Sequence, residues 1–130
     1  MKTPKITYED FMDLCKSSDI QPNHLFACLR KTLGVSQSKL AYRLDTEHIN
    51  QNSISRYEHK NIIDAKYEYI LWQWVVKEMN SYGRPTKSGS AVWLSIYIAA
   101  VELYILRYAT KKQAYTLQAA MIIAIRNFAS

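Results

Sequence analysis

Four polar side chains, Gln51, Asn52, Ser55 and Arg56, are spaced so that they share one side of a short helix. Their chemistry suits the base edges of DNA, because Gln and Asn amides pair bidentately with adenine, Arg with guanine, and Ser with either base. Ile54 falls on the opposite side, where it would pin the helix to the rest of the fold. The pattern predicts a helix that lies in the major groove and contacts bases. A solvated polar face is the simpler alternative.

A second group of residues could hold the DNA backbone. Gln37 opens a short expected helix whose first backbone N–H groups have no partner within the helix. Those N–H groups and the Gln37 amide could therefore bind a phosphate. Lys39, Arg43 and Lys60 are expected to add phosphate contacts, and His59 is a further candidate.

The charge of the chain agrees with an anionic partner. The 130 residues include 17 Lys and Arg against 11 Asp and Glu, a net charge of +6. Residues 29–60 hold six basic and three acidic side chains, whereas residues 1–20 hold three basic and four acidic ones. A basic cluster favours nucleic acid first and an anionic membrane surface second.

No membrane span is expected. The most apolar stretch, residues 91–106, is shorter than the roughly 20 apolar residues that a spanning helix needs. It also contains Glu102, which we expect to pair with a cation such as Arg107 or Lys112, or to line an interface. A buried helix is the better interpretation.

Residue patterns typical of an enzyme are absent from the sequence. It has no catalytic triad in a supporting context, no phosphate-binding glycine loop and no spacing typical of metal ligands, so no catalytic residue, metal or cofactor is expected. His24, His48 and His59 share no ligand spacing. Cys15 and Cys28, in a chain without a signal peptide, are expected to be reduced, buried thiols of a cytoplasmic protein. A disulfide between them is the minor alternative.

The elements that must position these residues are helices. Long periodic runs of apolar residues without strict alternation predict an all-α fold. We expect Gly34 to end one helix in a left-handed conformation, and Ser36 and Asn50 to cap the next two. The expected helices are Thr7–Ser17, Pro22–Leu33, Gln37–Leu44, Gln51–Glu58, Asp64–Tyr82, Ala91–Tyr108 and Ala114–Phe128, with a linker at Tyr82–Gly89.

Residues 24–63 resemble the helix-turn-helix of phage repressor and Cro-type (XRE-like) transcriptional regulators. The family pattern is a Leu-Arg pair, Gly-x-Ser-Gln, Leu-Ala, a turn, and Ile-Ser-x-x-Glu. It is matched here by Leu29-Arg30, Gly34-Val35-Ser36-Gln37, Leu40-Ala41 and Ile54-Ser55-Arg56-Tyr57-Glu58. The sequence departs from the family in a longer turn between the two short helices, and in lacking the Gly and Pro that usually follow the Glu.

The resemblance implies a lambda-repressor-like arrangement of the N-terminal half. It also implies a structural ion pair between Arg30 and Glu58, which would tie the first helix of the motif to the recognition helix. A phosphate contact by Gln37 follows as well. Base contacts are implied for the recognition helix at Gln51, Asn52, Ser55 and Arg56.

The second half of the chain is expected to have a different role. Its three expected helices are aromatic-rich and apolar on more than one face, which is more surface than a helix-turn-helix can cover. We therefore expect residues 1–63 to form a DNA-binding domain, and residues 64–130 to supply core and a homodimer interface. A ligand pocket among Trp72, Trp74 and Trp93 is the alternative.

Together these features predict a sequence-specific transcriptional regulator that binds double-stranded DNA as a homodimer. Its two recognition helices, residues 51–58, would reach half-sites about 34–36 Å apart. The main alternative is an antitoxin- or inhibitor-type module that grips a protein partner and binds DNA for autoregulation. A ligand-responsive regulator is a third hypothesis, and an enzyme is the class least favoured.

Overall fold

The computed structural model describes residues 6–44, 46–81 and 92–128, and in the last range it describes the side chains of residues 94–119. These residues form seven helices and no strand, which confirms the predicted all-α fold class. The helices are α1 (Tyr8–Ser18), α2 (Pro22–Thr32), α3 (Gln37–Leu44), α4 (Gln51–Lys60), α5 (Ala65–Ser81), α6 (Val92–Arg107) and α7 (Lys111–Phe128).

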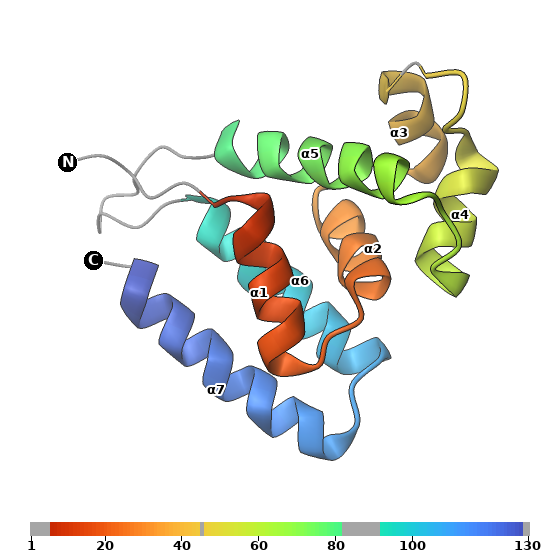
Figure 1. The fold of residues 1–130 in the computed structure, drawn as a ribbon. Helices are drawn as coiled ribbons and strands as arrows, with labels where there is room; N and C mark the ends of the chain where they lie inside the picture. The colour runs from red at the N-terminus through yellow and green to blue at the C-terminus, as the bar shows by residue number, and fades with distance from the viewer. Residues whose placement is uncertain (1–5, 45, 82–91, 129–130) are drawn as a thin grey trace.

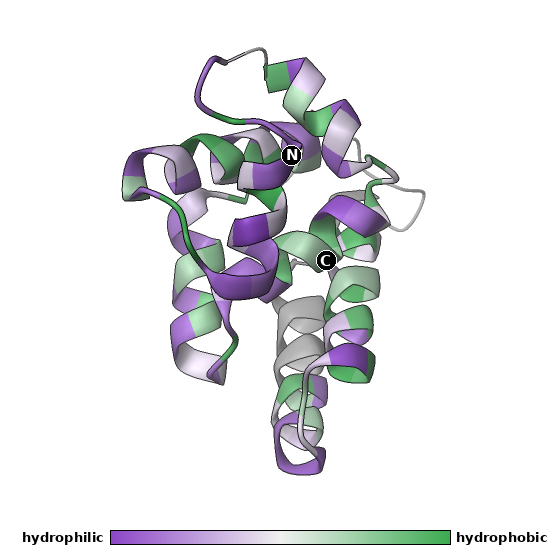
Figure 2. Cartoon of the chain, turned by 90° about the vertical axis from the view of Figure 1, so that its right-hand side faces the viewer, coloured by the Kyte–Doolittle hydropathy of each residue, from purple (hydrophilic) through white to green (hydrophobic). Residues whose placement is uncertain are grey.

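Helix α2 occupies the middle of the molecule (Figure 1). It packs against α6 on one side and against α4 and α5 on others, while α1 lies between α5 and α7. Helices α3 and α4 contact each other at one end of the molecule. Seen from that end, hydrophilic and hydrophobic residues share the same helices, as expected when each helix has one buried face (Figure 2).

Local capping explains most helix ends. The Thr7 side chain accepts a hydrogen bond from the backbone N–H of Asp10 at 3.2 Å, and the Asp10 side chain accepts one from the backbone N–H of Thr7 at 2.8 Å. Asn50 caps α4 in the same reciprocal way with Ser53. Asp19 ends α1 and Asn61 ends α4 in the left-handed conformation, each with φ of 55°. These residues fix where the short N-terminal helices begin and end.

Two predicted boundaries shift by more than one residue, for local reasons. Helix α4 runs two residues beyond the predicted end, because Asn61 supplies the left-handed cap. Helix α7 begins at Lys111 and not at Ala114, because the side chains of Thr110 and Gln113 each bond the other's backbone N–H at 3.2 Å. Thr110 therefore caps the last helix, which starts at Lys111. The predicted linker at residues 82–89 lies outside the described residues.

One aromatic cluster joins the two predicted halves of the chain. Trp72 of α5 is fully buried, with its ring centroid 5.1 Å from Phe11 and 5.9 Å from Phe26. Its indole Nε1 donates to the Tyr57 hydroxyl of α4 at 2.9 Å, and Phe11 also contacts Tyr97 of α6 at 6.2 Å. The predicted boundary between residues 63 and 64 coincides with the turn between α4 and α5. The buried residues on its two sides belong to a single core.

Both cysteines are free and buried, as predicted. Burial raises the pKa of Cys15 to about 12 and that of Cys28 to about 11, so both thiols are protonated near neutral pH. Among the described residues, no helix is long and apolar enough to cross a membrane.

Candidate nucleic-acid interface

A tight turn and two short helices form the candidate interface. Gly34 ends the α2 segment with φ of +75°, a conformation that favours glycine. Ser36 then caps α3, because its hydroxyl accepts a hydrogen bond from the backbone N–H of Lys39 at 3.1 Å. Both features were predicted. Leu40 of α3 and Ile54 of α4 are fully buried, so the two short helices are fixed through their apolar sides.

The outer side of α4 carries the residues predicted to contact bases. Gln51, Asn52 and Arg56 are exposed, and Ser55 is half-buried. The Ser55 carbonyl lies 2.8 Å from Nδ1 of His59, so the imidazole folds back onto the helix one turn earlier. The structure thus places these side chains on one exposed face.

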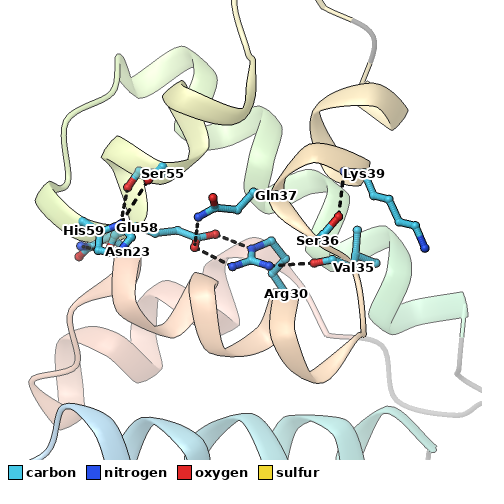
Figure 3. A network of polar contacts seen from close by, with 9 residues as sticks. All are labelled: Asn23, Arg30, Val35, Ser36, Gln37, Lys39, Ser55, Glu58 and His59. Carbon is cyan, nitrogen blue, oxygen red and sulfur yellow. Dashed lines mark hydrogen bonds and ion pairs between the residues drawn. The ribbon is translucent and has the colours of Figure 1, made fainter.

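A buried polar network holds α4 to the helices beneath it (Figure 3). Arg30 donates from Nε to Oε2 of Glu58 at 2.6 Å, and from Nη2 to Oε1 at 2.8 Å. Its Nη1 donates to the Val35 carbonyl at 2.9 Å. The side chains of this pair are only 7% and 3% exposed, and the bidentate geometry satisfies both charged groups. The ion pair therefore connects α2, the turn after it and α4.

Two further side chains bond to Glu58 and were missed by sequence reasoning. Gln37 Nε2 donates to Glu58 Oε1 at 2.9 Å, so the residue predicted to contact a phosphate also braces α3 against α4. Asn23 Nδ2 donates to the backbone carbonyl of Glu58 at 3.1 Å. Asn23 lies 35 residues away in the sequence, and no local pattern links it to Glu58.

The residues predicted to contact phosphates are distributed over both short helices. Lys39 and Arg43 are exposed on α3, and Lys60 is exposed at the end of α4. Tyr42, which sequence reasoning did not single out, is 86% exposed between the two α3 cations. Tyrosine hydroxyls donate hydrogen bonds to phosphate oxygens, so Tyr42 could bind a phosphate as the two neighbouring cations could.

The described side chains give little support for the alternative of a ligand pocket among the tryptophans. Trp72 is part of the core and Trp74 is 8% exposed, with its indole Nε1 buried and without a hydrogen-bond partner. Trp93 lies outside the described side chains. A separate, shallow polar cleft of about 460 Å³ lies between the end of α1 and the start of α7, away from the tryptophans.

The described residues form no metal-ligand cluster, and the acid of α6 is not buried. No group of three or more His, Cys, Asp or Glu side chains is close enough there to hold a metal ion. Glu102 is exposed on α6 and is not part of the core.

Comparison with known proteins adds no relative. No protein-family model, curated protein or solved structure matches this chain.

Proposed function

We propose that this protein is a sequence-specific DNA-binding transcriptional regulator that places α4 in the major groove. The observation that carries the proposal is the pairing of an exposed base-reading face with a rigid support. Gln51, Asn52 and Arg56 are exposed along α4, while Glu58 of the same helix is buried and fixed by Arg30. A recognition helix needs both features, because base contacts require accurately placed side chains.

The second half of the chain would hold two copies together. Leu106 of α6 and Tyr115 of α7 are 83% and 78% exposed, which leaves large apolar side chains without cover in a single chain. A homodimer of this kind would present two α4 helices to half-sites about 34–36 Å apart. The resemblance to phage repressor-type regulators supports the same arrangement.

The test is selection of bound sequences from random double-stranded DNA at a stated salt concentration. The proposal expects one enriched motif, with two related half-sites if the protein binds as a dimer. Arg56→Ala should then weaken binding to the selected duplex by about 1–3 kcal/mol and relax the preference at one base position. Enrichment of no motif, or an Arg56→Ala variant with unchanged affinity and preference, would refute the assignment.

The exposed apolar side chains on α6 and α7 also favour a second candidate function. An antitoxin- or inhibitor-type module would use Leu106 and Tyr115 to bind another protein, with DNA binding reserved for autoregulation. Sedimentation of the purified chain separates the two candidates. A dimer at micromolar concentration supports the regulator, whereas a monomer that co-purifies in a 1:1 complex with one cellular protein supports the module.

A further inference from the structure

The C-terminal end of α6 lies next to α2 and close to the end of α4, although these segments are far apart in the sequence. The Tyr104 hydroxyl accepts a hydrogen bond from the backbone N–H of Gln21 at 3.1 Å. The Tyr108 ring stacks on His24, with centroids 4.1 Å apart and the planes inclined by 3°. In Figure 1 the end of α6 lies on the same side of the molecule as α4, with α2 between them.

The first turn of α2 connects this region to α4. Asn23, the residue before His24, donates to the backbone carbonyl of Glu58, the residue before His59, at 3.1 Å. Burial lowers the pKa of His24, and the charge of His59 lowers it further. The ends of α4 and α6 thus both contact the first turn of α2.

Three helices carry exposed cations in this region. Lys31 of α2, Lys60 of α4 and Arg107 of α6 are all exposed, and we call these three residues the basic ledge. Arg107 directly precedes Tyr108, which stacks on His24, and Lys31 directly follows Arg30, which bonds the Glu58 carboxylate of α4. The charges of Lys31 and Arg107 also lower the pKa of Cys28, against the rise that burial causes.

The buried acid of α4, Glu58, is already neutralised. Glu58 acts electrostatically on both Cys28 and Tyr108, but its carboxylate is buried and bonded to Arg30 and Gln37. Its charge is therefore compensated from within the fold. The outward-facing charge of the ledge stays positive, and its complement is an anionic surface.

The geometry of a groove-bound helix indicates which anionic surface this is. The exposed residues Asn52, Arg56 and Lys60 recur every four residues, so one stripe of α4 runs from the base-reading positions to the ledge. The major groove is only about 12 Å wide, so a helix within it is bordered by phosphates on both sides. A cation just beyond the end of the stripe would then meet the phosphodiester backbone.

We propose that Lys31 and Arg107 bind backbone phosphates beside the groove that α4 occupies, so that the second half of the chain takes part directly in DNA binding. The inference rests on the proposed function, and it extends the DNA-binding surface beyond the helix-turn-helix to α6. Such contacts add affinity and fix orientation but carry no sequence information. They were not expected from the sequence, where the region after residue 63 was assigned to core and dimerisation.

The test is the salt dependence of binding, measured by fluorescence anisotropy with a selected duplex and with a scrambled one. The variant is Lys31→Gln/Arg107→Gln, which keeps most of each aliphatic stem. The matched control is Lys16→Gln/Lys77→Gln, which removes the same charge from exposed positions on α1 and α5. Circular dichroism and thermal unfolding check that every variant is folded.

The expected result is a change in slope. Each phosphate contact contributes about 0.9 to the steepness of the slope of log K against log salt. The Lys31→Gln/Arg107→Gln variant loses two contacts, so its slope should be shallower by about 1.8. At 0.1 M salt this corresponds to a loss of roughly 60-fold in affinity, equal on both duplexes. The control should keep the slope of the unmodified protein, because charges more than about 10 Å away are screened at this salt concentration.

Failure of the inference differs from failure of the proposed function. If the unmodified protein binds a selected site and Arg56→Ala relaxes its preference, while the ledge variant keeps the original slope, only the inference is overturned. If the unmodified protein selects no DNA sequence, the proposed function is overturned and the inference falls with it. Should the double variant not fold, the single variants Lys31→Gln and Arg107→Gln give the same test, each with an expected slope change of about 0.9.

Discussion

Removal of the Glu58 carboxylate should be among the most destabilising single changes in this protein. The carboxylate accepts two hydrogen bonds from Arg30, at 2.6 and 2.8 Å, and a third from Gln37 at 2.9 Å. In Glu58→Ala, the Arg30 guanidinium would remain buried and would keep its hydrogen bond to the backbone carbonyl of Val35 but lose its counter-ion. A buried cation without its counter-ion is strongly unfavourable, because the low-dielectric surroundings replace water poorly.

The magnitude follows from the burial of both partners. Breaking a buried pair by removing one member costs about 3–5 kcal/mol. A domain of ordinary stability has about 5–15 kcal/mol in total, so the loss is a large fraction of the free energy of unfolding. For a chain of this length the corresponding fall in Tm is about 10–15 °C. Glu58→Ala should therefore be folded at low temperature and partly unfolded near 37 °C if the unmodified protein is of average stability.

Urea unfolding followed by tryptophan fluorescence measures this effect. Trp72 is buried and hydrogen-bonded to Tyr57, the residue before Glu58, so its emission reports on the relevant region. The comparison needs Arg30→Met, Glu58→Leu and the double variant as well as Glu58→Ala. Replacing both charged partners with apolar residues is often neutral or stabilising, so the double variant should regain most of the loss.

The reasoning would be wrong under either of two results. If the free energy of unfolding of Glu58→Ala were less than about 1 kcal/mol below that of the unmodified protein, the pair would behave like an exposed ion pair. If the double variant lost as much unfolding free energy as the two single variants lose together, Arg30 and Glu58 would not be coupled.

Two further predictions concern the turn before α3 and the region where α2, α4 and α6 meet. Gly34→Ala should destabilise the protein by about 1–2 kcal/mol in urea unfolding, since an added Cβ meets no atom within 4 Å and only the left-handed backbone is strained. Gly34→Asn should cost less, and equal losses would contradict this explanation. Burial lowers the pKa of His24 below its ordinary 6.5, so its contribution to stability is complete above about pH 6.5 and is lost as the pH falls through the lowered value. His24→Gln should flatten the decline in unfolding free energy between pH 7.5 and 5, and an unchanged decline would contradict the proposed cause.

Elements with strong local signals could be predicted from the sequence. Gly34, Ser36 and Asn50 each form or end a helix through contacts within a few residues, and all three have the predicted role. The start of α7 was missed although Thr110-Lys111-Lys112-Gln113 has the Thr-x-x-Gln pattern of a capping box, and the structure forms both of its hydrogen bonds. That signal is local, so this boundary could have been predicted from the sequence.

The candidate site was predictable in its residue types and less so in its partners. The exposed stripe of α4 follows from helical periodicity. When Ile54 faces inward, the polar side chains of Asn52 and Arg56 must face outward. The bond from Gln37 to Glu58 spans 21 residues and the bond from Asn23 spans 35. Such pairs form only where helices cross, and the sequence does not state the crossing geometry.

The sequence by itself therefore determined that the chain is helical, where most helices begin, and which polar residues share the outer side of α4. Those properties depend on backbone propensity, capping and periodicity, which act over a few residues. The tertiary structure alone decided that the two halves share one aromatic core and that the end of α6 lies against the first turn of α2. It did so because α6 packs along α2, which stacks Tyr108 on His24 although the two residues are 84 positions apart in the chain.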